Sequence, residues 1–448
     1  MRKNSTISDS KLKVRINDKL IQDYEAGYAN DSEGAMFLKK GSEIFEINYV
    51  ASKIWLLLNK YKNQKNDLKN EDIVDYLSNI VEGVSEQVLS SDIEFIISKF
   101  NELEIHPFNN ENIQINNFNT PNSIAWNYTY KCNLNCKHCY SRKLIYTEME
   151  KDFKIKIAEA IGQSNIFSVD FGGGEPFMDN SLFETAAILK NYGVDISLTT
   201  NGTLVNDSTI SEIKRIKFSA IGVSIDSDQE DIQNAIRGEN VFKKAVKTIR
   251  KLVKEDIFTE AITTISKLNA NRLENIHKFC KELGVSVWRV QLFRPMGLGY
   301  QNINKFMLSA DEVKKAFTVL YNLFQDNSIK IDLGIGSEPL WHLFFSDLKL
   351  ENKIQSTYLK GGPCGKISCC IRPNGDVSPC AYVPMSIGNM LKSSLELIWN
   401  EMRNWVVHND ILSGKCLSCP VNKSCLGGCK ANRILLNEKY DIYCWKNE

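Results

Sequence analysis

The chain has 448 residues, enough for two or three domains, and its hydrophobic content of 43% and charged content of 24% are ordinary for a globular protein. The formal net charge is +1 and the basic residues are spread out, which disfavours nucleic acid or an anionic membrane as a partner. Residues 1–13 are polar and lack a signal-peptide core, and apolar runs such as 54–58 are too short to span a bilayer. We therefore expect a cytoplasmic protein.

Thirteen cysteines are many for a cytoplasmic chain, in which thiols stay reduced and dense cysteines favour metal binding over disulfides. Their distribution is uneven. None precedes Cys132, three lie within 132–139, Cys280 stands alone, and nine lie between Cys364 and Cys444. The pattern predicts one metal site in the middle of the chain and more near its end.

The first part of the chain predicts a disordered lead over 1–13 and a small α+β domain over 14–108. Alternation predicts a strand over 41–48, and apolar residues at helical spacing predict helices over 51–60, 71–80 and 92–103. The strand and first helix resemble the precursor-recognition domains of ribosomal-peptide maturases. That resemblance implies that a leader peptide adds as a strand to a sheet edge. A winged helix or a simple cap is the alternative. The asparagine-rich segment 109–122 is predicted to be a linker.

A regular βα alternation follows over 123–305 and predicts a parallel sheet with right-handed crossovers. Six units fit a partial (β/α)6 barrel of the TIM type, and a doubly wound sheet is the alternative. The predicted strands are 123–129, 167–171, 195–200, 220–226, 259–266 and 286–293. The predicted helices are 152–163, 182–191, 207–216, 242–254 and 271–283. In such barrels the chemistry collects at the carboxyl ends of the strands.

The first strand leads into Cys132, Cys136 and Cys139, spaced CxxxC and CxxC and followed by Tyr140. Three thiolates can hold three irons of a [4Fe-4S] cube and leave the fourth open, whereas electron-transfer clusters take four cysteines. A zinc knuckle is the alternative. The spacing resembles the cluster loop of the radical S-adenosylmethionine (SAM) enzymes. The resemblance implies that the open iron binds SAM and that one electron splits SAM into methionine and a 5′-deoxyadenosyl radical.

Other strand ends carry glycines and short polar residues that suit a bound cofactor. The same resemblance implies that Gly173, Gly174 and Glu175 contact the methionine part of SAM. It also implies that strand-end polar residues and an arginine complete the SAM site. The further candidate contacts are Asn201, Ser224, Asp226, Arg237 and Leu292.

The last third is predicted to comprise a bridging region, 306–360, with a helix over 307–326, and a cysteine-rich domain, 361–448. The order of Cys364, Gly375 and Cys380, followed by four cysteines and Cys444, resembles the SPASM extension of radical SAM peptide maturases. A zinc ribbon is the alternative. The resemblance implies two auxiliary [4Fe-4S] clusters and therefore three clusters in all. Cys364, Cys380 and Cys429 would hold the near cluster. The distal cluster would take Cys416, Cys419, Cys425 and Cys444.

The sequence does not decide which residue is the fourth ligand of the near cluster. Cys369 and Cys370 are adjacent on a predicted strand, so their side chains point to opposite faces and at most one easily reaches the cluster. We list Cys370 as the candidate, and an open iron that binds a substrate thiolate is the alternative. Ala381 follows Cys380 where sulfatase-maturing members carry an aspartate base. A similar Pro-Cys-Ala stretch is present in the subtilosin-type maturases.

These observations predict a sactipeptide-type maturase that forms thioether crosslinks, from cysteine sulfur to carbon, in a ribosomally made precursor peptide. An electron donor such as flavodoxin or ferredoxin is expected as a partner. Carbon–carbon crosslinking is the alternative reaction. A radical enzyme whose N-terminal domain is only a cap, and a winged-helix redox regulator that uses its clusters as sensors, are the alternatives from other classes.

Overall fold

The computed structural model describes residues 119–144, 146–325, 329–333, 338–350, 361–409, 412 and 414–446, together with the helices and strands between 15 and 116. The chain divides into two compact units, Met1–Thr120 with Gln355–Thr357, and Pro121–Ile354 with Tyr358–Glu448. The lead predicted over 1–13 lies outside the described residues. None of the described helices combines the length and the hydropathy needed to cross a bilayer.

The N-terminal unit contains a three-stranded antiparallel sheet in the order β4-β3-β5, a two-stranded pair β1-β2, and three helices. The helices bury apolar residues such as Ile54, Trp55, Leu77, Ile96 and Phe100, which form the core of this unit. The elements are β1 (Arg15–Ile16), β2 (Lys19–Leu20), β3 (Met36–Lys40), β4 (Glu43–Ile47), α1 (Tyr49–Tyr61), α2 (Asn70–Ser78), α3 (Glu86–Glu102) and β5 (Gln114–Asn116).

The prediction of a linker over 109–122 needs correction at β5. Gln114–Asn116 pairs antiparallel with β3 through Leu38 and Ile115, and so belongs to the N-terminal sheet. The segment offers only three alternating residues among asparagines, too few for a strand signal. The strand is fixed by its partner rather than by its own sequence.

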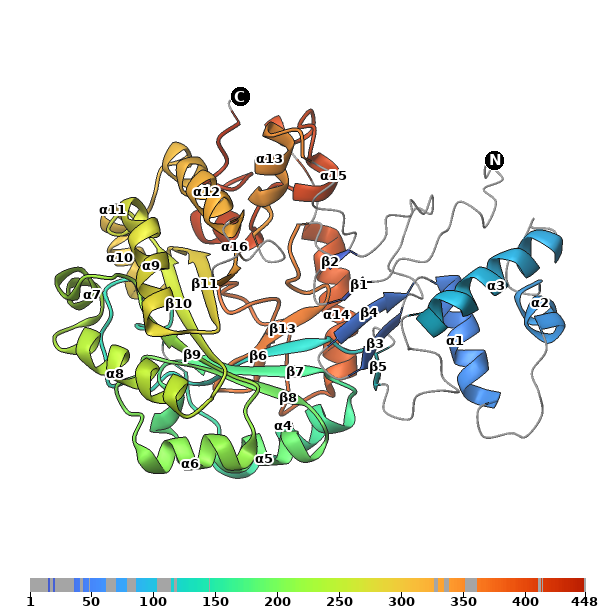
Figure 1. Ribbon diagram of the computed structural model, residues 1–448, viewed down its shortest axis with the longest axis horizontal. Coiled ribbons are helices and arrows are strands. Elements are labelled where there is room, and N and C mark those ends of the chain that lie inside the picture. Colours follow the sequence, from blue (N-terminus) through green and yellow to red (C-terminus); the bar gives the residue numbers. More distant parts are fainter. Residues whose placement is uncertain are drawn as a thin grey trace. The chain divides into compact units, whose positions relative to one another are not determined.

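The larger unit is built on a ten-stranded sheet in the order β12-β11-β10-β9-β8-β7-β6-β13-β14-β15 (Figure 1). Pairing is parallel from β12 to β13 and antiparallel from β13 to β15. The strands are β6 (Ser123–Thr129), β7 (Ser168–Gly173), β8 (Asp195–Thr200), β9 (Ala220–Ser224), β10 (Thr259–Ile265), β11 (Val287–Leu292), β12 (Lys330–Asp332), β13 (Ser368–Ile371), β14 (Asp376–Ser378) and β15 (Gly388–Asn389). The predicted partial barrel is confirmed, and the cysteine-rich part of the chain extends its sheet at β6.

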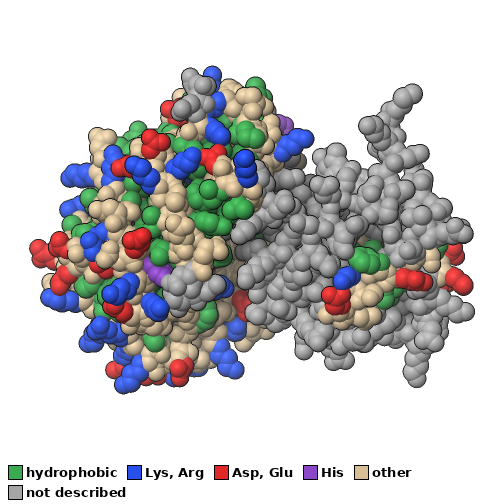
Figure 2. Space-filling view, turned by 45° about the horizontal axis from the view of Figure 1, so that its top comes forward, with side chains coloured by type: hydrophobic (Ala, Val, Ile, Leu, Met, Phe, Trp, Pro, Cys, Tyr) green, Lys and Arg blue, Asp and Glu red, His purple; other side chains and the backbone are tan. Residues whose placement is uncertain are grey.

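Helices cover the outer face of the curved sheet, and one continuous hydrophobic core fills the space between the two layers (Figure 1). Along β6, Ile124, Trp126 and Tyr128 enter this core, whereas Ala125 and Asn127 face the inside of the barrel. The helices are α4 (Lys151–Gln163), α5 (Leu182–Asn191), α6 (Asp207–Ile216), α7 (Glu230–Arg237), α8 (Val241–Lys254), α9 (Leu273–Leu283), α10 (Leu298–Gln301), α11 (Ile303–Phe306), α12 (Ala310–Gln325), α13 (Leu340–Asp347), α14 (Leu395–Asn409), α15 (Asn422–Cys425) and α16 (Lys430–Leu436). Figure 2 shows Lys or Arg and Asp or Glu side chains interspersed on one face of this unit.

A buried ion pair fastens α4 to the sheet. Lys154 is 1% exposed, and its Nζ lies 2.5 Å from the Asp179 Oδ2 atom and 4.3 Å from the centre of the Tyr128 ring. The Tyr128 hydroxyl in turn shares hydrogen bonds of 2.7 Å with Ser181 and Thr185. The network joins α4, β6 and the start of α5.

We predict that Lys154→Met lowers the unfolding free energy by about 3 kcal/mol, because Asp179 loses the cation that compensates its charge. Lys151→Met is the matched control on the same helix, since the Lys151–Glu184 pair has both side chains more than half exposed. It should leave the unfolding midpoint unchanged. Chemical denaturation of the anaerobic holoprotein measures both, and equal midpoints for the two variants would contradict the prediction.

Candidate active site

The carboxyl ends of the barrel strands surround a cavity of about 360 Å³. Both cysteine-rich parts of the chain contribute to its wall. The predicted site residues that line it are Cys132, Cys136, Cys139, Tyr140, Gly173, Gly174, Asn201, Ser224, Arg237, Leu292 and Cys380. Glu175 and Asp226 are fully buried behind the wall and act on residues that face the cavity.

The Cys132–Cys139 loop places its sulfurs next to backbone N–H groups. The backbone N–H groups of Leu134 and Arg142 donate to the Cys132 and Cys139 sulfurs over 3.4 and 3.3 Å. Burial raises the pKa of the Cys136 thiol to about 12, so coordination to a metal would be needed to deprotonate it at neutral pH. Each of the thirteen cysteines is a free thiol.

The glycines after β7 allow the backbone to pass close to the cysteine loop. Gly174 N–H donates to Thr129 O over 2.7 Å, and Gly173 has a φ of +106°. A Cβ atom on Gly174 would lie 2.2 Å from the carbonyl oxygen of Lys131, the residue before Cys132. The close approach of the Lys131 backbone therefore requires glycine at position 174, whether or not a cofactor also does.

The Glu175 side chain turns from the cavity toward β8. Its carboxylate accepts hydrogen bonds from Thr200 Oγ1 over 2.7 Å and from the backbone N–H of Asn201 over 2.8 Å. Burial raises the pKa of Glu175 to about 7. The structure thus makes Glu175 the support of Asn201, whose Nδ2 lies 2.9 Å from Asn133 Oδ1 in the cysteine loop.

Asp226 follows β9 and holds two residues of the cavity region at once. Its Oδ2 lies 2.7 Å from Arg237 Nε and 3.2 Å from His138 Nε2 in the cysteine loop. Arg237, expected to face the carboxylate of SAM, lines the cavity but directs its Nε and Nη2 atoms at Asp226. Sequence reasoning did not assign His138 to the site, because no local pattern links it to Asp226.

Aromatic rings join the first cysteine loop to the last domain. The Tyr140 hydroxyl donates to Asn127 Oδ1 over 2.9 Å, and its ring centre lies 5.0 Å from that of Tyr382. Tyr382 follows Cys380 by two residues and also lines the cavity. Sequence reasoning missed Tyr382, and its place in the Pro-Cys-Ala-Tyr stretch was the available signal.

Cys364, Cys380 and Cys429 meet around a second, smaller cavity. Within this half-buried group, a hydrogen bond with Cys364 lowers the pKa of Cys380 to about 7 and raises that of Cys364. On β13, Cys370 pairs with Ala125, which lines the main cavity, and Cys369 pairs with Ile124 in the hydrophobic core. In-register neighbours face the same way, which puts Cys370 on the face of Ala125, although Cys369 is the one of the two that borders the main cavity.

The distal set gathers around two short helical turns near the C-terminus. Besides burial, the charges of Cys444 and Cys419 raise the pKa values of Cys416 and Cys425, which shows an electrostatic interaction among the four thiols. In the described residues, no three His, Cys, Asp or Glu side chains converge closely enough to hold a single metal ion. The cysteines form three separate sets, each with a donor chemistry suited to iron–sulfur clusters.

Comparison with known proteins agrees with this geometry. Residues 126–280 match the radical SAM superfamily model and residues 363–420 match the SPASM iron-sulfur cluster-binding domain model. The chain therefore carries a radical SAM domain followed by a SPASM domain, and the resemblance expected from the sequence is confirmed. Together the two domains support a radical SAM enzyme.

The relatives differ in their reactions. The AdoMet-dependent heme synthase of Methanosarcina barkeri is 26% identical over 73% of this chain and 97% of its own length. The antilisterial bacteriocin subtilosin biosynthesis protein AlbA of Bacillus subtilis is 24% identical over 74% of this chain and 73% of its own. The fold resembles that of Streptococcus suis SuiB bound to precursor peptide SuiA, with a TM-score of 0.66, 16% identity, and coverage of 93% of this chain and 100% of that one.

We predict that Gly174→Ala lowers the unfolding free energy by about 1–3 kcal/mol and reduces the iron content, because the new methyl group displaces the backbone before Cys132. Gly172→Ala is the matched control, since a Cβ there meets no atom within 4 Å. Circular dichroism melting and iron analysis of the anaerobic proteins test this. Identical melting points and iron contents would contradict it.

The raised pKa of Glu175 predicts a pH-dependent stability. An acid whose folded pKa is about 7 and whose ordinary pKa is 4.5 binds more protons when folded, so stability falls as pH rises between these values. Between pH 6 and 8 the wild type should lose about 1 kcal/mol more than Glu175→Gln. Glu184→Gln, an exposed control, should follow the wild type in denaturation at both pH values. A Glu175→Gln protein with the wild-type slope would contradict the assignment.

Proposed function

We propose that this enzyme is a maturase of a ribosomally made peptide, in which it forms intramolecular thioether crosslinks from cysteine sulfur to carbon. The cavity carries the proposal. Cys132, Cys136 and Cys139 stand on one wall of it, and Cys380 and Tyr382 of the SPASM domain stand on another. A substrate held in this space would face both cysteine sets at once.

Cys132, Cys136 and Cys139 would hold a [4Fe-4S] cluster with one iron left for SAM. When bound, the reduced cluster and SAM would supply a 5′-deoxyadenosyl radical that removes one hydrogen atom from the peptide. The second electron of this two-electron oxidation would pass to an auxiliary cluster as the carbon–sulfur bond forms, and the thiol would lose its proton. The chain's residues would position this chemistry. Backbone groups at Gly173 and Gly174 and the side chains of Asn201, Ser224 and Arg237 border the space for SAM, and Tyr140 and Leu292 offer apolar surfaces to it. Glu175 and Asp226 would hold these residues in place.

The second cysteine set would hold the near auxiliary cluster through Cys364, Cys370, Cys380 and Cys429. The distal cluster would take Cys416, Cys419, Cys425 and Cys444. The thioether is favoured over a carbon–carbon bond because Ala381, which lines the cavity beside Cys380, provides no carboxylate to act as a base. If Cys370 gave up its place to the substrate cysteine, coordination would favour the thiolate form of that cysteine. The alternative product is a carbon–carbon crosslink.

A peptide substrate is supported by the relatives and by the N-terminal unit. Subtilosin biosynthesis involves AlbA, and SuiB was solved bound to a precursor peptide. Among the described strands, β5 pairs with β3 on one side only, so it could accept a leader peptide as an added strand. A flavodoxin or ferredoxin would deliver the electrons.

We predict that the reconstituted protein contains about twelve irons per chain, four for each of three clusters, and that it releases 5′-deoxyadenosine from SAM with dithionite. Replacing Cys132, Cys136 and Cys139 together by alanine should remove about four irons and abolish this release, because the cluster with the open iron is lost. Cys280→Ala is the matched control, a buried cysteine outside all three sets, and should keep both. Full release by the triple variant would contradict the assignment.

The reaction itself is tested with a cysteine-containing precursor peptide encoded beside the gene. Each thioether should lower its mass by that of two hydrogen atoms, and Cys→Ser in the precursor should prevent the change. If the mass loss persists after the precursor's cysteines are replaced, the thioether is contradicted and a carbon–carbon crosslink is favoured. Release of 5′-deoxyadenosine with no peptide modified would contradict peptide maturation but leave the radical chemistry standing.

A further inference from the structure

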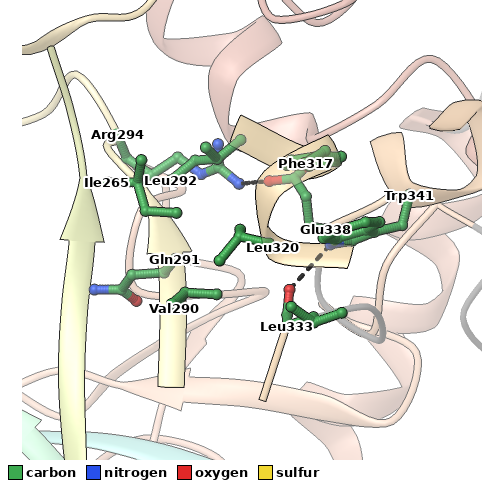
Figure 3. Close-up of a pocket in the computed structure, with 10 residues that line it drawn as sticks. All are labelled: Ile265, Val290, Gln291, Leu292, Arg294, Phe317, Leu320, Leu333, Glu338 and Trp341. Atoms are coloured by element: carbon green, nitrogen blue, oxygen red, sulfur yellow. Dashed lines mark hydrogen bonds and ion pairs between the residues drawn. The ribbon is translucent and has the colours of Figure 1, made fainter. Parts of the chain in front are cut away.

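One buried guanidinium, that of Arg294, lines the main cavity together with Cys380 of the second cysteine set. Arg294 follows β11, and its side chain is 9% exposed. It lines both the main cavity and a smaller one of about 40 Å³, shown in Figure 3, where it pairs with Glu338. Its Nη1 atom is buried and has no hydrogen-bond partner among the described residues. A buried guanidinium with an unused donor at a cavity wall suggests a ligand that is absent here.

The charges that act on Arg294 include those of the SPASM residues Cys429 and Asp441. Burial lowers the pKa of Arg294, but the charges of Cys429, Glu338 and Asp441 outweigh it, so the side chain stays ionised. Arg294 in turn lowers the pKa values of Cys429 and Cys380 against the effect of their burial. Arg294 therefore interacts electrostatically with two of the three cysteines, Cys364, Cys380 and Cys429, that line the cavity of the near set.

Hydrogen bonds fix the C-terminal segment beside this guanidinium. The Tyr443 hydroxyl donates to the carbonyl oxygen of Phe293 over 2.8 Å, and the Arg294 guanidinium carbon lies 6.0 Å from the Tyr443 ring centre. Asp441 accepts a hydrogen bond of 2.7 Å from the backbone N–H of Cys429. Phe293, which follows β11, and the backbone of Cys429 are thus both tied to the segment 441–443, next to Arg294.

We propose that Arg294 is a positioning residue for the near auxiliary cluster, to which it supplies a positive charge and the Nη1 hydrogen-bond donor, and that it raises the electron affinity of that cluster. The inference rests on the proposed binding of this cluster by Cys364, Cys380 and Cys429. A cation and a hydrogen bond to sulfur both stabilise the reduced state, which carries one more negative charge. Glu338 partly cancels the cation, so it opposes the effect.

Because Arg294 and Glu338 carry opposite charges, their removal should shift the cluster midpoint in opposite directions. A general loosening of the site would not produce this result. Redox titration of the anaerobic holoenzyme, followed by electron paramagnetic resonance, measures the midpoint of each cluster. Arg294→Met should lower the reduced-to-oxidised ratio of one auxiliary cluster at fixed potential about tenfold, equivalent to about 59 mV for a one-electron couple. Glu338→Gln should shift the same cluster in the opposite direction, and Arg294→Lys should retain part of the wild-type value.

Arg272→Met is the control, because Arg272 also pairs with a carboxylate, at 2.6 Å from Asp228, but no cysteine is among the groups that act on it. It should leave all midpoints unchanged. Unchanged midpoints in both Arg294→Met and Glu338→Gln, or shifts of the same sign, would overturn the inference. If the Arg294→Met protein loses the cluster, the Glu338→Gln protein alone tests the inference. A higher midpoint of that cluster supports the inference, and an unchanged or lower midpoint contradicts it. A wild type with iron for only two clusters would refute the proposed ligand sets, and the inference with them, before any variant is titrated.

Discussion

The buried carboxylate of Asp226 is the interaction on which the geometry of the site depends. Besides Arg237 and His138, the backbone N–H of Thr264 donates to it over 3.0 Å. Burying a lone carboxylate is costly, but Arg237 and His138 outweigh burial and hold the pKa of Asp226 well below its usual range. One side chain thereby fixes the cysteine loop, α7 and β10 relative to each other, and the cavity takes its shape from these three elements.

A second constraint places the auxiliary cysteines. Strand β13 pairs in parallel with β6, and β6 is also the strand that leads into the Cys132–Cys139 loop. The SPASM hairpin is therefore a continuation of the barrel sheet rather than a separate body attached by a linker. Two contacts between loops also join the barrel to the SPASM domain. They are the ring contact of Tyr140 with Tyr382 and the hydrogen bond from Tyr443 to Phe293. The distance between the two cysteine sets follows from strand register.

Local sequence patterns predicted the bounds of several barrel strands and helices, but they did not predict the contacts between residues distant in sequence. Strands β6 and β8 and helices α5 and α6 have the predicted bounds, because alternation and helical spacing there agree with the flanking polar residues. Strand β9 ends at Ser224 instead of Asp226, because the Asp226 N–H donates to Gln233 Oε1 rather than to the sheet. The family resemblance implied three cysteine sets, and in the structure Cys132, Cys136 and Cys139 line one cavity and Cys364, Cys380 and Cys429 another. The contacts of His138 with Asp226 and of Arg294 with Glu338 join residues distant in sequence, which no spacing encodes.

The central claim is that the Cys132–Cys139 loop leaves one cluster iron open for SAM. Electron–nuclear double resonance of the reduced enzyme with SAM labelled by ¹⁵N at its amino group measures this directly. Our account predicts a hyperfine coupling from the labelled nitrogen, which is lost when Cys132, Cys136 and Cys139 are replaced and kept when the auxiliary cysteines are replaced. Identical spectra with labelled and unlabelled SAM, from protein with this cluster intact, would contradict it.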